Sequence, residues 1–158
     1  MTRRFLSGPA IAVLALLAAL AAPLVWDSRA FAADGDVYET ISPSQLIKLI
    51  ENRGDQAKTS GDDTVVWTTK DGILFAIQIS EKEDSLIVLY YDSDLKADDV
   101  KINKWNKDKA FSKAYLDKEG DAFLELDLDL EGGVTEDNML SFFKLCEASA
   151  KGFEKEMK

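Results

Sequence analysis

The feature that most constrains the fold is a row of leucines alternating with acidic residues toward the carboxyl end. Positions 124, 126, 128 and 130 are leucine, and positions 125, 127 and 129 are glutamate or aspartate. Successive side chains of a β-strand point to opposite faces, so this pattern predicts a strand with one buried and one hydrated face. The buried face needs an apolar layer to pack against.

The last part of the sequence can provide that layer. Thr135 is suited to cap a helix, and Glu136 and Asp137 place negative charge in its first turn. The apolar positions of this helix then step by three and four along one stripe: Met139, Phe143, Cys146, Ala150, Phe153 and Met157. We therefore predict a long amphipathic helix from residue 135 onward.

The remaining elements follow from capping signals and periodicity. Ser42 and Gln45 form a capping box, and Gly54 fits the left-handed position that ends a helix. A second helix is predicted over residues 98–109. Strands are predicted over residues 64–69, 73–79, 86–91, 113–117 and 122–130. The fold class is thus α+β, an antiparallel β-sheet with flanking helices in the order α-β-β-β-α-β-β-α.

The connection between the first two strands carries a specific turn signal. Asp71-Gly72 lies between two β-rich runs, which predicts a hairpin. A two-residue loop of this composition favours a type I′ turn, with positive φ at both central residues.

The amino terminus has the three parts of a secretory signal. Arg3 and Arg4 precede an uncharged apolar run, and Ala30-Phe31-Ala32 supplies small residues for signal peptidase. Pro23 interrupts the apolar run, which favours cleavage over a retained membrane anchor. The arginine pair also resembles a twin-arginine signal, but the following residues are one place out of that pattern, so ordinary export is favoured.

These features divide the chain into three parts. We expect a signal peptide over residues 1–32, a flexible leader over residues 33–41 and one domain over residues 42–158. The expected location is the periplasm or the exterior of the cell, without a stable membrane anchor after cleavage.

Charge excludes one class of partner. Removal of residues 1–32 takes away three basic residues and one acidic residue, so the net charge changes from −10 to −12. Nucleic-acid binding depends on Lys and Arg replacing counterions at phosphates, so we expect no nucleic-acid partner.

The residue types present restrict catalysis. The chain contains no histidine, which removes the usual general base, the Ser-His and Cys-His nucleophile systems and nearly all zinc sites. Cys146 is the only cysteine and lies on the apolar helix stripe, which predicts a buried packing thiol. We expect no enzyme activity, no catalytic residue, no metal and no cofactor.

Two arrangements of acidic residues resemble known kinds of site. Asp127, Asp129 and Glu131 imitate the first half of a calcium loop, but the twelfth position is Asn138 rather than the bidentate Glu, and the leucines require a strand. Asp127 and Asp129 also have the same-face spacing of a glycosidase carboxylate pair, without an aromatic platform beside them. A hydrated strand face followed by a helix cap is favoured over both.

Several motifs resemble a known family, mainly between residues 102 and 135. They are Ile102-Asn103-Lys104-Trp105-Asn106, then Phe111, Ala114-Tyr115-Leu116-Asp117, Gly120-Asp121, Asp127-Leu128-Asp129-Leu130 and Gly132-Gly133-Val134-Thr135. In these motifs the chain resembles the YbjN family, whose members are described as bacterial sensory transduction regulators. The resemblance implies a fold similar to the type III secretion chaperones and is compatible with a homodimer.

The chain also departs from that family. Many relatives have cysteines around the middle hairpin, where residues 80–85 contain none, so a role of those thiols does not transfer. The candidate binding or family-motif residues are Asn103, Trp105, Asn106, Tyr115, Asp117, Asp127 and Asp129. Trp105 can form an aromatic recognition surface or anchor its helix on the sheet, and the anchor is favoured.

Our leading hypothesis is therefore an exported, non-enzymatic domain that binds an unknown protein or peptide, as a chaperone-like or regulatory accessory protein. The alternative is a small-molecule-sensing module of the cell envelope with an apolar pocket between sheet and helices. A hydrolase that uses carboxylates alone is the least favoured function.

Overall fold

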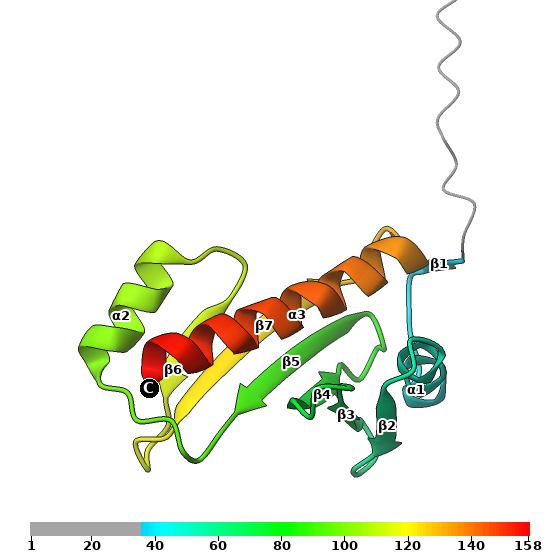
Figure 1. Cartoon of the computed structure of the whole chain (residues 1–158). Helices are drawn as coiled ribbons and strands as arrows, with labels where there is room; N and C mark the ends of the chain where they lie inside the picture. Colours follow the sequence, from blue (N-terminus) through cyan, green and yellow to red (C-terminus); the bar gives the residue numbers. More distant parts are fainter. Residues whose placement is uncertain (1–35) are drawn as a thin grey trace, which may run out of the picture. The chain divides into compact units, whose positions relative to one another are not determined.

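The computed structural model describes residues 36–158, and the expected signal peptide lies outside them. Three helices occur in this part of the chain: α1 (Pro43–Asn52), α2 (Asp99–Asp108) and α3 (Glu136–Met157) (Figure 1). The main sheet contains β2 (Gln56–Thr59), β3 (Thr64–Thr68), β4 (Leu74–Ile79), β5 (Ser85–Tyr91), β6 (Lys113–Leu116) and β7 (Ala122–Asp129). Two short strands, β1 (Val37–Tyr38) and β8 (Val134–Thr135), pair with each other. The predicted α+β class is confirmed.

The six-stranded sheet is antiparallel, with the order β2-β3-β4-β5-β7-β6. The strands β3, β4 and β5 form the predicted meander, and β2 adds a fourth strand at its edge. The chain then passes through α2 and returns as the β6–β7 hairpin, in which β7 pairs with β5 and β6 forms the edge of the sheet. The leucine row therefore lies inside the sheet, with Leu126 opposite Val88 and Leu124 opposite Tyr90.

The core lies between the sheet and the helices. α3 runs along β7 in Figure 1, and every residue of its predicted apolar stripe is buried. In the row on β7, Leu124, Leu126 and Leu130 are buried, whereas Leu128 is only half-buried. Trp67 is one of two buried tryptophans in the core, and it stacks on Phe75 with 4.5 Å between ring centroids.

The local signals of the first helix are confirmed. The Ser42 hydroxyl accepts from the Gln45 N–H, and the Ser42 N–H donates to the Gln45 side chain at 2.9 Å. After α1 ends, Gly54 has a φ of 83°, which is the left-handed conformation expected after a helix.

The region before α1 differs from the predicted flexible leader. In the described residues of that segment, Val37 and Tyr38 pair with Thr135 and Val134, and Ile41 is fully buried. Gly133 allows this approach, because a Cβ there would lie 2.8 Å from Val37 Cγ1. Pairing and burial thus fix residues 37–41 to the domain, against the expectation from their polar composition.

Three strands, β1, β2 and β8, and one turn type were not predicted correctly. β2 lacks apolar alternation and was missed, because an edge strand of this kind buries little. The hairpin at Asp71-Gly72 is present, but only Gly72 has positive φ there, at 84°. The Gly72 N–H donates to the Thr69 C=O at 2.9 Å, so the connection is a type I turn followed by a glycine bulge rather than a type I′ turn.

Candidate functional site

Two of the predicted site residues join α2 to its surroundings. Trp105 is 2% exposed, donates from Nε1 to the Ser112 hydroxyl at 3.1 Å and meets Phe153 edge-on at 5.2 Å. The Asn106 amide donates to the Ala114 C=O at 2.9 Å and accepts from the Ala114 N–H at 2.8 Å. Both side chains are thus occupied in holding α2 against β6 and α3.

Two others lie on solvent-facing surfaces. Asn103 is exposed on α2. Tyr115 is half-buried on β6 and stacks on Phe123 of β7 at 5.6 Å, while Tyr91 of β5 stacks on the same ring at 4.9 Å. Tyr115 thus belongs to an aromatic ladder that crosses three neighbouring strands.

The three predicted aspartates have different surroundings. Asp117 accepts from the Glu119 and Asp121 N–H groups at 3.0 and 2.8 Å and so shapes the β6–β7 turn. Asp129 accepts from the Glu131 N–H at 2.9 Å at the end of β7. Asp127 is exposed. Within residues 36–158, no three acidic or cysteine side chains are grouped so that they could hold a metal ion.

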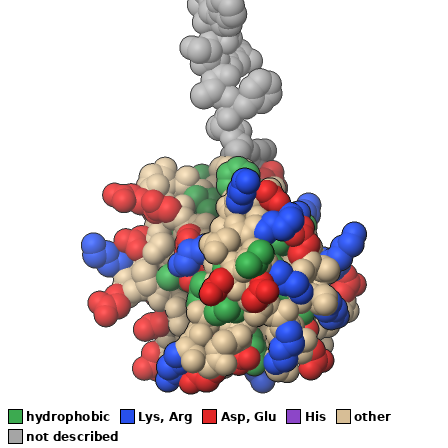
Figure 2. All heavy atoms as spheres, turned by 90° about the vertical axis from the view of Figure 1, so that its left-hand side faces the viewer, with side chains coloured by type: hydrophobic (Ala, Val, Ile, Leu, Met, Phe, Trp, Pro, Cys, Tyr) green, Lys and Arg blue, Asp and Glu red, His purple; other side chains and the backbone are tan. Residues whose placement is uncertain are grey.

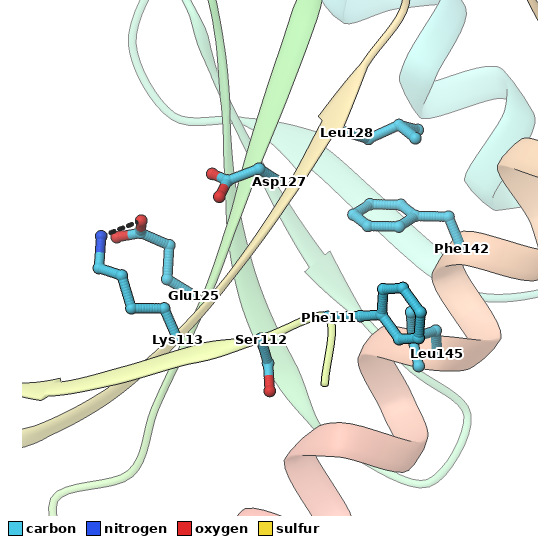
Figure 3. Close-up of a pocket in the computed structure, with 8 residues that line it drawn as sticks. All are labelled: Phe111, Ser112, Lys113, Glu125, Asp127, Leu128, Phe142 and Leu145. Carbon is cyan, nitrogen blue, oxygen red and sulfur yellow. Dashed lines mark hydrogen bonds and ion pairs between the residues drawn. The ribbon is translucent and has the colours of Figure 1, made fainter. Parts of the chain in front are cut away.

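Asp127 borders a groove of about 360 Å³ between β7 and α3. We call this cavity the groove. Figure 3 shows Glu125 and Asp127 on one side of β7, and Leu128, Phe111 and the α3 side chains on the other. Its lining residues are Phe111, Ser112, Lys113, Glu125, Asp127, Leu128, Phe142 and Leu145.

The groove exists because β6 is shorter than β7. β6 pairs with β7 only from Lys113 opposite Glu125 to Leu116 opposite Ala122. Before Lys113 the chain turns away at Phe111, whose φ of 62° lies in the left-handed region and is incompatible with a strand. Residues 126–129 of β7 therefore pair with β5 alone, and we call their unpaired side the open edge.

Hydrogen-bond alternation shows which main-chain groups face the open edge. The Leu130 N–H donates to the Asp84 C=O on the β5 side at 2.8 Å. The main-chain N–H and C=O groups of even-numbered residues in β7 therefore point toward β5. On the other side, the Asp117 N–H donates to the Asp121 C=O at 2.9 Å. The main-chain groups of odd-numbered residues therefore point toward β6. The N–H and C=O of Asp127 thus face the open edge, where residues 36–158 supply no main-chain partner.

The two sides of the groove differ in chemistry. On the α3 side, Phe142, Leu145 and Leu128 present apolar surface, and Phe111 is 81% exposed beside them. On the other side, Glu125 forms an ion pair with Lys113 at 2.5 Å. This hydrogen bond to Glu125 raises the pKa of Lys113, so the ammonium stays charged. The groove can therefore accept a chain with one apolar and one polar face.

Other surface features are less specific. On the face in Figure 2, acidic and basic side chains are interspersed and the hydrophobic areas between them are small. A second cavity of about 210 Å³ is lined by Arg53, Asp55, Thr69, Lys70, Asp71 and Glu147. Four of its five charged side chains form ion pairs: Arg53 pairs with Asp55 and Glu147, and Asp71 pairs with Lys151.

Sequence reasoning selected Asp127 and placed Phe111 in a family motif, but it missed Phe142 and Leu145. A signal for the open edge was present, since the predicted strand over residues 122–130 is longer than its hairpin partner over residues 113–117. The contribution of α3 had no comparable signal, because it depends on how the helix lies on the sheet.

Comparison with known proteins gives one match. The sequence model of the family YbjN, described as "Putative bacterial sensory transduction regulator", matches residues 42–158. No curated protein and no solved structure matched the chain. No helix within residues 36–158 has the length and apolar character needed to cross a membrane. The family match spans most of the sequence and every element of the main sheet, and on this basis the chain belongs to the YbjN family.

Proposed function

We propose that this protein is an exported, non-enzymatic binding protein that holds an extended segment of a partner protein at the open edge of β7. The observation that carries the proposal is the unpaired main chain of Asp127 beside an apolar groove. An unpaired strand edge is a template for another strand, and addition of a peptide strand is a common mode of recognition.

The dimensions of the site fit one short strand. Asp127 and Asp129 have the same parity, so each directs one N–H and one C=O toward the open edge. A segment of about four residues can pair with residues 126–129, because paired strands advance by similar distances per residue. Alternate side chains of that segment would then point toward Phe142 and Leu145.

The chemistry of the chain supports binding rather than catalysis. The sequence has no histidine, and burial raises the pKa of the Cys146 thiol to about 12. A neutral buried thiol is a poor nucleophile. The family description as a regulator agrees with a function exerted through partners.

Main-chain pairing is tested with Asp127→Pro. Proline has no N–H, and at this position it removes a donor that faces the open edge rather than β5. We expect the Asp127→Pro variant of the full chain to bind a fluorescein-labelled, alternating Thr-Val peptide about tenfold more weakly, as measured by fluorescence anisotropy. Asp127→Ala is the matched control, because it removes the same side chain but keeps the N–H, and it should bind like the wild type.

A second measurement covers the case in which the proline variant does not fold. Two Thr-Val peptides are used, one N-methylated on every threonine and the other on every valine. Only alternate N–H groups of an added strand point toward β7, so one of the two peptides should lose affinity for the wild-type chain. Equal affinity of both N-methylated peptides and the parent peptide would contradict strand addition. In that case a small apolar ligand becomes the better candidate, since the groove volume lies in the lower range of small-molecule sites.

Export is the second part of the proposal, and it rests on the signal-like residues 1–32. We expect the protein recovered from its host to begin after Ala32 or Ala33 and to fractionate with the envelope or the medium. Intact-mass measurement of the recovered protein checks this. An unprocessed chain beginning at residue 1 or 2 in the cytosol would contradict it.

A further inference from the structure

The β6–β7 hairpin shows which kind of residue pairs with the acidic side of β7. Lys113 of β6 lies directly across from Glu125 and forms an ion pair with it at 2.5 Å. Opposite charges at directly paired positions stabilise antiparallel strands. The next two residues on the same face, Asp127 and Asp129, lie beyond the end of β6 and have no such neighbour on that side.

The other neighbours of these aspartates do not neutralise them. On the β5 side, Asp127 lies opposite Ile87 and Asp129 lies opposite Ser85. Among residues 36–158, no basic side chain forms an ion pair with either aspartate. The acidic row therefore continues past its only cross-strand lysine.

The opposite face of the same strand end is apolar. Leu128 is half-buried there, in contrast to its buried neighbours Leu126 and Leu130, and it borders the groove with Phe142 and Leu145. Directly paired residues on neighbouring strands share a face, so an added strand would place alternate side chains beside Asp127 and Asp129 and the others beside Leu128.

The same charges argue against a second copy of this chain as the occupant. Antiparallel pairing of two open edges would bring the aspartates of both copies close together, and like charges in directly opposed positions are destabilising. Each processed copy would also carry a net charge of about −12, which follows from the −10 of the full chain.

We propose that the open edge selects a partner strand with alternating basic and apolar residues, in which the basic residues face Asp127 and Asp129 and the apolar residues enter the groove. This inference rests on the proposed function, because it specifies the segment that the open edge would hold. The expected partner is a protein with an exposed β-strand segment that is cationic and amphipathic.

The test compares three labelled peptides of equal length with the full chain: alternating Lys-Val, Thr-Val and Glu-Val. Two surface-type charge pairs of about 0.5 kcal/mol each amount to about a fivefold change in affinity, so we expect Lys-Val to bind about fivefold more tightly than Thr-Val. Glu-Val should bind more weakly than Thr-Val. The preference for lysine should decrease with added salt.

Two controls separate pairing at the groove from general attraction to an acidic protein. Asp127→Asn with Asp129→Asn should abolish the preference for Lys-Val, whereas Asp62→Asn with Asp63→Asn removes two exposed acids outside the groove and should keep it. A peptide with the lysines and valines in separate blocks should bind weakly despite its equal charge.

The outcomes distinguish the two proposals. If Thr-Val binds in the groove but Lys-Val and Glu-Val bind equally well, the charge pattern is refuted and strand addition stands. If the preference for lysine persists in the Asp127 and Asp129 double variant, other acidic residues cause it and the inference is refuted. If none of the three peptides binds, strand addition is refuted together with it.

Discussion

At the scale of single residues, Phe111 combines two unfavourable properties. Its φ of 62° is a left-handed conformation that costs a residue with a Cβ about 1 kcal/mol or more, and its large apolar side chain is 81% exposed. The turn at Phe111 is also what leaves the edge of β7 open. Strain and exposure at one residue beside a groove are expected where a side chain serves binding rather than stability.

This leads to a prediction for substitutions at Phe111. Phe111→Gly should raise the free energy of unfolding by about 1 kcal/mol, because glycine adopts positive φ without strain. The same substitution should weaken binding of the Thr-Val peptide, since the groove loses an apolar wall. Urea denaturation and anisotropy titration measure the two effects.

Phe111→Ala is the matched control for that prediction. Alanine keeps a Cβ and therefore the strain, so it should weaken peptide binding without the gain in stability. A Phe111→Gly variant no more stable than Phe111→Ala would contradict the assignment of strain, because both variants lack the aromatic ring and differ only in the Cβ.

At the scale of elements, those with strong periodicity could be predicted from sequence. α3 and β7 each repeat one apolar spacing over many residues, and the stripe of α3 and three of the four leucines of the predicted strand are buried as expected. β2 has only Ala57 half-buried on one side, so its place in the sheet depends on pairing with β3 rather than on its own pattern. β1 and β8 have two residues each, too few to show a period.

The candidate site was predictable in part for the same reason. The unequal lengths of the hairpin strands follow from sequence, and so does the acidic face with Asp127 and Asp129. The apolar wall does not, because Phe142 and Leu145 become neighbours of β7 only after α3 packs on the sheet. Leu128 illustrates the difference: its pattern is that of the other leucines, yet the groove beside it leaves it half-buried.

At the scale of the whole molecule, packing has to hold the domain without covalent help. The chain has one cysteine, which is buried, so it forms no disulfide within itself. Half of the ion pairs among the described residues join two exposed side chains, and such pairs contribute little to stability. Stability therefore depends on the apolar core, which also buries two groups that ionise at high pH.

Those two groups predict how the molecule responds to alkali. Burial, with a smaller contribution from the Asp92 carboxylate, raises the pKa of Tyr90 from 10.0 to about 12. Burial likewise raises the pKa of Cys146 from 9.0 to about 12. Both groups are neutral when protonated, so the folded state keeps protons that the unfolded state has lost. Their stabilising effect is complete below about pH 9 and is lost as the pH rises toward about 12.

The free energy of unfolding should therefore decline between about pH 9 and 12, and the decline should be smaller in a variant with both Tyr90→Phe and Cys146→Ala. The substitutions themselves lower stability at neutral pH, because each changes a buried side chain. The comparison must accordingly use the slope of the free energy against pH, obtained from urea denaturation at several pH values, and not the absolute stability. The slope depends on Tyr90 and Cys146 only if their protons are retained in the folded state. An unchanged slope in the double variant would therefore assign the alkaline loss of stability to the exposed charged groups.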